Sequence, residues 1–275
     1  MTAAQRSRQH RPTNALVALT LVVCATMGLA SEPAPAGNAA AADAAKDAEL
    51  LRAIASQARS PVKNENQIVR IDGHPVLGNP DAVLTLIEFS DLQCGFCRRH
   101  INSTFPVLLE RYVSTGRMRY VFFDFPMEQK HPQAHRPAIA ARCAAEQDAV
   151  QPMRERLYAN PGDVHDDKLR GHAAALGLDL AAFSACIVDT HKGEAVRRDL
   201  ALGQQLMVRG TPTFFVGYSR SDGTEVRVLR RIIGAQPLAV FEAAISGVVA
   251  EAQGSMAHLS VRAGPDVPLF GGAMD

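Results

Sequence analysis

The sequence predicts an α/β domain into which an all-helical subdomain is inserted, and three observations carry this prediction. A β-rich run, VLTLIEF at residues 83–89, is followed closely by a Cys-Gly-Phe-Cys motif and a helical pattern. An Ala-rich helical block then occupies residues 131–207, which is too long for a loop. Two further strand-like runs and a helix follow this block, so it interrupts one α/β unit.

The composition is that of a globular protein without a charged binding field. The 275 residues are 47% hydrophobic, which is ample for a core. Lysine and arginine number 29 against 28 aspartates and glutamates. Because no basic excess is available to neutralise phosphates or anionic lipid, binding to nucleic acid or to a membrane surface is not expected.

Residues 1–30 predict a cleaved export signal. Three arginines precede an apolar run at 15–30, which ends in the small residue Ala30. This run of about 16 residues falls short of the roughly 20 that a membrane-spanning helix needs, so cleavage is favoured over an uncleaved anchor. Cys24 follows Val23, where a lipobox has a small residue, and we expect Cys24 to leave with the signal.

The elements before the motif follow in a simple order. Residues 31–60 are expected to be a flexible segment with a short helix at 47–59. The first part of the α/β domain is then expected at 61–130. It begins with a short strand at 67–71 and continues with the central strand at 83–89.

The elements after the motif complete the domain. Apolar residues at three- and four-residue spacing predict a helix from Cys94 to Gly116, and a strand follows at 117–125. After the helical insertion, the second part of the domain is expected at 208–253, before a loose tail at 254–275. Its elements are two strands and a closing helix, at 213–217, 225–233 and 237–253.

The pair Cys94 and Cys97 could be redox-active, half of a zinc site or a structural staple. Zinc would need two further Cys or His ligands at comparable spacing, and the sequence has no second pair of this kind, so we expect neither a metal nor a cofactor. A thiolate at a helix N-terminus is stabilised by unpaired backbone N–H groups. Cys94 is therefore the expected nucleophile, and Cys97 the resolving cysteine that lies deeper in the helix.

The chain resembles the DsbA-like thiol–disulfide oxidoreductases of the thioredoxin superfamily, of the DsbA, DsbG and BdbD type. Four segments carry the resemblance, in the family's order: IEFSDLQCGFC (87–97), AARCAAEQ (140–147), RGTPTFFV (209–216) and GAQP (234–237). The resemblance covers roughly residues 65–253. It implies a thioredoxin-like fold with an inserted all-helical subdomain.

The resemblance also assigns residues around the dithiol. Glu88 stands where the superfamily has a buried acid, which either relays a proton to Cys97 or is paired with a lysine or arginine. Thr211 and Pro212 match the cis-proline loop, which would bind substrate peptide together with Phe96. Phe96 replaces the histidine of strongly oxidising relatives, so the pKa of Cys94 is expected below roughly 8.5 but above roughly 3.5.

Four cysteines remain once the signal is removed. Cys143 and Cys186 both fall in the insertion, and a second disulfide between them is expected, as some DsbA-like proteins have one; two buried free thiols are the alternative. His131 and His135 open the insertion and could line the groove near the dithiol, but a surface or capping role is favoured for each, and neither is assigned as catalytic.

The leading functional hypothesis is a periplasmic or otherwise exported oxidase of dithiols in cysteine-containing exported proteins. The resemblance implies a DsbB-like membrane partner that reoxidises it. The alternative is an isomerase or reductase kept reduced by a DsbD-like partner, since CGxC with Thr-Pro also occurs there. A peptide-binding chaperone with an idle dithiol is a third hypothesis. The sequence leaves the oligomeric state open.

Overall fold

A computed structural model describes residues 67–219 and 223–262, all of which fall in one compact unit. The expected signal peptide at 1–30 lies outside the described residues. So do the expected segment at 31–60 with its helix and residues 263–275 of the expected tail.

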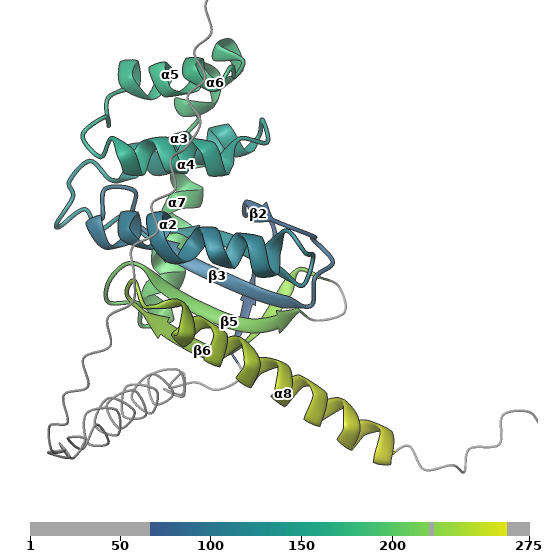
Figure 1. Ribbon diagram of the computed structural model, residues 1–275. Helices are drawn as coiled ribbons and strands as arrows, with labels where there is room; N and C mark the ends of the chain where they lie inside the picture. Colours follow the sequence, from purple (N-terminus) through teal and green to yellow (C-terminus); the bar gives the residue numbers. More distant parts are fainter. Residues whose placement is uncertain (1–66, 220–222, 263–275) are drawn as a thin grey trace, which may run out of the picture. The chain divides into compact units, whose positions relative to one another are not determined.

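Six strands form one mixed sheet in the order β1-β6-β5-β3-β4-β2 (Figure 1). Their bounds are β1 Ile68–Arg70, β2 Val76–Leu77, β3 Leu84–Ser90, β4 Met118–Asp124, β5 Thr213–Ser219 and β6 Glu225–Ile233. Strands β3 and β4 are parallel, and every other neighbouring pair is antiparallel. A parallel pair needs a crossover connection, which the helix after β3 supplies.

Both faces of the sheet are covered at its centre. Every residue of β3 and β4 is buried, as the continuous apolar run of β3 predicts for a strand packed on two sides. Alternate side chains of β3 enter two different cores: Leu86 belongs to the larger cluster and Ile87 to the smaller one. Glu88 is two residues from Leu86 and shares its face.

Helices supply the two covers. On the face of Leu86 lie α2, Gly95–Leu108, which continues as the π-helical segment η1, Leu109–Val113, and α8, Leu238–Arg262. The end of the long helix α7, Thr190–Gln205, covers the opposite face through Leu200 and Leu202, together with its C-cap residue Leu206.

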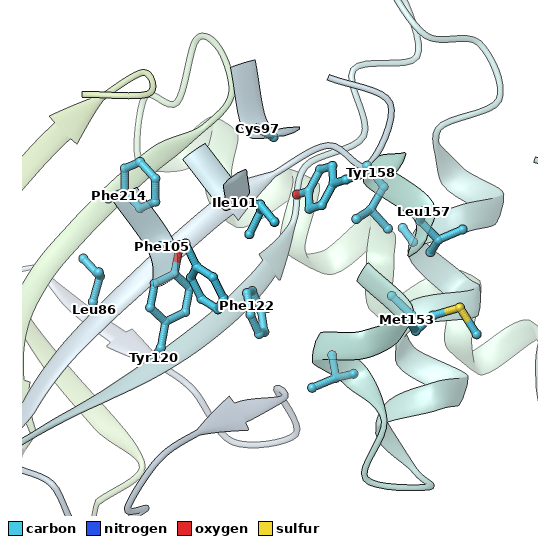
Figure 2. Close-up of a cluster of buried hydrophobic side chains, with 14 of the residues drawn as sticks. Leu86, Cys97, Ile101, Phe105, Tyr120, Phe122, Met153, Leu157, Tyr158 and Phe214 are labelled. Carbon is cyan, nitrogen blue, oxygen red and sulfur yellow. The ribbon is translucent and has the colours of Figure 1, made fainter. Parts of the chain in front are cut away.

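The helical insertion lies between β4 and β5, as the sequence predicts. Its helices are α3 His135–Ala145, α4 Val150–Ala159, α5 Asp166–Ala175, α6 Leu180–Ile187 and α7 Thr190–Gln205. Figure 2 shows that α4 is part of the main core: its residues Met153, Leu157 and Tyr158 belong to the same cluster as Ile101 of α2 and Phe122 of β4. The insertion is therefore packed against the helix that carries the dithiol.

The expected second disulfide is confirmed. Cys143 of α3 is bonded to Cys186 of α6, across 43 positions of sequence. Cys143 is 1% exposed, so the bridge is largely shielded from solvent thiols. The alternative of two buried free thiols is thereby excluded for this structure.

Two details differ from the expectations. The strand β2 was not predicted, because two residues are too few to show a periodic pattern. Helix α8 continues to Arg262 instead of ending at 253, so residues 254–262 are helical and not part of a loose tail. A single glycine, Gly254, costs a helix only about 1 kcal/mol, and the next proline is Pro265.

Replacing both Cys143 and Cys186 by serine should lower the free energy of unfolding by about 4 kcal/mol, because the bridge restricts the unfolded chain. Urea unfolding of both proteins in oxidising buffer measures this. Thiol exchange by the Cys94 and Cys97 pair should remain largely intact. Equal stability of the two proteins in oxidising buffer would contradict the prediction.

Candidate active site

Cys94 lies at the junction between the central strand β3 and helix α2. It follows β3 after a three-residue turn and caps the N-terminus of α2 with extended backbone angles. Its N–H donates to the carbonyl oxygen of Asp91 at 3.0 Å, which closes the turn. Its Sγ lies 3.4 Å from the carbonyl oxygen of Thr211, and the residue is 8% exposed. The sulfur is therefore partly covered, with one side held by a second loop.

The surroundings of Cys94 favour its thiolate. Hydrogen bonding from the Cys97 thiol is the largest cause, and contacts with Thr211 and the N–H groups of Cys97 and Phe96 add to it. Burial opposes these effects, but the pKa is still lowered to about 5. This value lies between the two limits that the sequence predicts for a helix-capping thiol without a neighbouring histidine.

Cys97 has the opposite environment. It is fully buried one turn into α2, and burial raises its pKa well above the usual thiol value. The hydrogen bond that it gives to Cys94 and the negative charge of Glu88 raise the pKa further. Both cysteines are free thiols in the structure. In this reduced dithiol the proton therefore resides on Cys97 and the charge on Cys94.

Glu88 is fully buried on the face of β3 that carries α2. Burial raises its pKa, while Arg154 and the hydroxyl of Tyr120 act in the opposite direction. The Tyr120 hydroxyl donates to Oε2 at 2.9 Å, and Nη2 of Arg154 lies 3.8 Å from the same oxygen. The other carboxylate oxygen has no hydrogen-bond partner. Glu88 thus lies next to an arginine, as one of the two alternatives has it, and its raised pKa is compatible with the proton relay, which stays a prediction.

Arg154 was not singled out by the sequence, because an arginine is ordinarily exposed, although its position four residues after Val150 and three before Leu157 lies on the apolar face of α4. It is 2% exposed, and its guanidinium lies 4.1 Å from the centre of the Phe122 ring. It donates to the hydroxyls of Ser90 and Tyr158 and lies 4.0 Å from a carboxylate oxygen of Asp124. A charged side chain of the insertion therefore contacts β3, the strand that leads to Cys94.

The loop before β5 faces the dithiol. The peptide bond between Thr211 and Pro212 is cis, as expected from the motif. The Thr211 hydroxyl contacts the sulfur of Met127 at 3.7 Å, and the Pro212 carbonyl accepts the N–H of Gly234 at 2.8 Å. These contacts fix the loop beside Cys94.

A groove of about 640 Å³ opens beside the dithiol. Its lining residues are Cys94, Gly95, Phe96, Arg99, Met127, Lys130, His131, Gly210 and Thr211. Three of the residues assigned from the sequence, Cys94, Phe96 and Thr211, thus meet at one cavity, and Phe96 is 58% exposed.

The structure brings His131 to this groove, which is the less favoured of the two roles that the sequence allows for it. Its Nδ1 lies 2.8 Å from Oδ2 of Asp91, whose side chain is fully buried. Asp91 also accepts the N–H groups of Gln93 and Met127. His135, by contrast, lies outside the groove and contacts the carbonyl oxygen of Gly193 at 3.3 Å.

Within residues 67–219 and 223–262, no cluster of three or more His, Cys, Asp or Glu side chains could hold a metal ion.

His100, on α2, is fully buried, and burial lowers its pKa to about 3. Its neutral ring lies 3.2 Å from the hydroxyl of Tyr120. His100 therefore extends the hydrogen-bonded chain that ends at Glu88.

A dithiol of this polarity, set opposite a cis-proline loop in a sheet with a helical insertion, defines the class of DsbA-like thiol–disulfide oxidoreductases. The chain belongs to the thioredoxin family, whose family model matches residues 71–234.

Solved structures of the same fold include alpha-DsbA1 from Wolbachia pipientis and oxidised BdbD from Bacillus subtilis. The first is 22% identical, with a TM-score of 0.56 over 68% of this chain and 96% of that one. The second is 20% identical, with a TM-score of 0.53 over 67% of this chain and 98% of that one. At these identities the likeness concerns the fold.

Among curated proteins, the Na(+)/H(+) antiporter NhaA 3 of Salinispora tropica is 32% identical over 152 residues. The match covers 55% of this chain but 23% of the antiporter. The chain thus spans about a quarter of the length of the curated relatives that it matches, and the name of these relatives says nothing about transport by this chain.

No helix in the part of the chain that the structure describes is both long and apolar enough to span a membrane.

Replacing Phe96 by histidine should lower the pKa of Cys94 below its value of about 5, because an imidazole next to the helix N-terminus can donate a hydrogen bond to the thiolate. The reduced form is then more stable and the disulfide more oxidising, by 30 mV for each 1.4 kcal/mol. Thiolate absorbance during a pH titration and equilibration with glutathione measure both quantities. A pKa that stays fixed or rises would contradict the prediction.

Replacing Glu88 by glutamine should change the pH dependence of stability. Because burial raises the folded pKa of Glu88 above its usual 4.5, the folded protein keeps a proton that the unfolded chain has lost. The wild type therefore loses stability, relative to Glu88→Gln, as the pH rises from about 4.5 through the folded pKa. Urea unfolding of both proteins at a series of pH values measures this, and a wild-type stability that stays constant or rises with pH relative to Glu88→Gln would refute the assignment.

Proposed function

We propose that this protein is an exported thiol–disulfide oxidoreductase that introduces disulfides into cysteine-containing exported proteins. The observation that carries the proposal is the contrast between the two thiols of the CGFC motif. Cys94 is an acidic thiol at the groove, whereas Cys97 is buried and keeps its proton. A stable Cys94 thiolate stabilises the reduced form, which makes the corresponding disulfide an oxidant.

The reaction begins with the disulfide form of the dithiol. A substrate thiolate attacks the Cys94 sulfur, the Cys94–Cys97 bond breaks, and Cys97 leaves with the electron pair. Glu88, whose raised pKa lets it carry a proton, supplies one to the buried Cys97 thiolate. The Arg154 charge next to the carboxylate stabilises Glu88 after that proton has left.

The mixed disulfide is resolved by the substrate itself. Its second thiolate attacks the substrate sulfur bonded to Cys94, and Cys94 leaves as the stabilised thiolate. The substrate has then lost two electrons and the protein has gained them. A DsbB-like membrane partner would remove these electrons and restore the disulfide. The Thr211–Pro212 loop and Phe96 would hold the substrate chain during both steps.

One observation favours the second candidate, a disulfide isomerase or reductase kept reduced by a DsbD-like partner. The side chain of Phe96 offers neither a hydrogen bond nor a charge to the Cys94 thiolate, which limits the oxidising power of the pair.

The export that we propose for this protein rests on the signal peptide that the sequence predicts at residues 1–30.

The redox state in cells tests these alternatives. Acid quenching followed by alkylation of the full chain should find Cys94 and Cys97 mostly as a disulfide, because an oxidase is kept oxidised. A mostly reduced pair would instead assign the isomerase or reductase function.

The same experiment on two variants tests the roles of the cysteines. Cys97→Ser should accumulate mixed disulfides with clients through Cys94, while Cys94→Ser should trap none, because only Cys94 opens to the groove. Trapping by Cys94→Ser would reverse the assignment. A lack of adducts in Cys97→Ser would favour a binding protein with an idle dithiol.

A further inference from the structure

Apart from the Cys94 thiolate itself, the wall of the groove carries positive charge and no negative charge. Among its nine lining residues, Arg99 and Lys130 are cationic. None of the nine is Asp or Glu. The side chains around the reactive sulfur therefore carry charge of one sign.

The two permanent charges are available to a ligand. Arg99 and Lys130 are exposed, and within the described part of the chain neither makes an ion pair with a carboxylate. The Arg99 guanidinium lies 4.6 Å from the centre of the Phe96 ring, which holds the charge over the exposed apolar surface. Lys130 is at the end of a turn closed by its N–H and the carbonyl oxygen of Met127 at 2.7 Å.

The two carboxylates near the groove, Asp91 and Glu128, do not line it and form no ion pair with Arg99 or Lys130. Asp91 is buried behind His131, and its oxygens accept three hydrogen bonds from His131, Gln93 and Met127. Glu128 is exposed but lines a different cavity, together with Gln129 and Arg209. An extended peptide in the groove thus meets apolar Phe96 and Met127 and, beside them, the two cations.

We propose that the groove selects protein segments in which Asp or Glu flanks the reactive cysteine. This inference rests on the proposed role of Cys94 as the nucleophile. Exposed charges of one sign around a site raise the association rate of oppositely charged partners and lower that of like-charged ones. The selection therefore acts on the rate at which the mixed disulfide forms.

Three synthetic peptides provide the test, each with one cysteine flanked by Glu, Gln or Lys and activated as a 2-pyridyl disulfide. They react with full-length Cys97→Ser protein, so that a single step is observed. The Cys94 thiolate attacks the peptide sulfur, the bond to the pyridyl sulfur breaks, and neutral 2-thiopyridone leaves after taking a proton from water. Its absorbance gives the second-order rate constant.

At low ionic strength the Glu peptide should react about tenfold faster than the Lys peptide, with the Gln peptide between them. At about 1 M salt, where the screening length is near 3 Å, the ratio should approach one. A ratio of one at low salt, or a preference for the Lys peptide, would overturn the proposal.

Variants connect the preference to the groove. In Arg99→Gln combined with Lys130→Gln, the Glu to Lys ratio should fall below about threefold, while the exposed Arg170→Gln on α5 should keep the full ratio. An unchanged ratio in the double variant would overturn the assignment to this groove. Because every comparison is a ratio within one protein, a change in the intrinsic reactivity of Cys94 cancels.

Dipyridyl disulfide, which carries no peptide, separates failure of this inference from failure of the proposed function. A Cys94 that reacts quickly with this reagent but does not discriminate between the peptides refutes the charge selection alone. If Cys94 reacts no faster than a free thiol of ordinary pKa, the proposed nucleophile is wrong, and the charge selection that rests on it is withdrawn as well.

Discussion

A negative charge on the sulfur of Cys94 is stabilised by donors at the start of α2, and the surrounding structure supplies the conditions for this. The strand β3 ends so that the helix begins at the sulfur, and the first backbone N–H groups of α2 are directed to it. Cys97 can donate its thiol hydrogen because burial keeps it protonated. The loop at Thr211 covers one side of the sulfur without shutting it off from the groove.

The buried carboxylate of Glu88, near Cys97, is a second feature on which the chemistry of the dithiol depends. A carboxylate as deeply buried as Glu88 would be protonated permanently in an apolar core, and it would then be unable to release a proton. Arg154 and Tyr120 moderate this effect without removing it, since the pKa of Glu88 stays raised. Because Arg154 belongs to α4, the helical insertion contributes to the electrostatics of the dithiol as well as to the shape of the groove.

The sequence predicts much of this site, for a physical reason. Short motifs identify Cys94, Cys97 and the Thr211–Pro212 pair. The roles expected for these residues depend on the local backbone conformation, and a few neighbouring residues determine that conformation. The disulfide between Cys143 and Cys186 was also foreseeable, because four cysteines make two pairs.

The remaining features depend on contacts between distant elements. Arg154 and His131 lie in helical or turn segments where a polar residue is ordinarily exposed, and only the packing of the insertion shows that Arg154 reaches Glu88 and that His131 meets Asp91. The short strand β2 has no pattern of its own, since its partner β4 determines its conformation. These contacts follow from tertiary structure; only Arg154 has a periodic signal, its place on the apolar face of α4, and that signal does not name its partners.

The position of the insertion also has a consequence for the order in which the protein acquires its structure. Cys94 and Thr211, in the loop that covers it, are 117 residues apart, and the whole insertion lies between them in the sequence. A chain emerging from its N-terminus therefore presents the CGFC turn before β5 exists to complete the sheet. Cys143 and Cys186 also emerge before that strand. During this interval all four thiols belong to one incomplete chain, and the correct pairing of Cys143 with Cys186 depends on contacts within the insertion, before the long-range β3–β5 pairing can form.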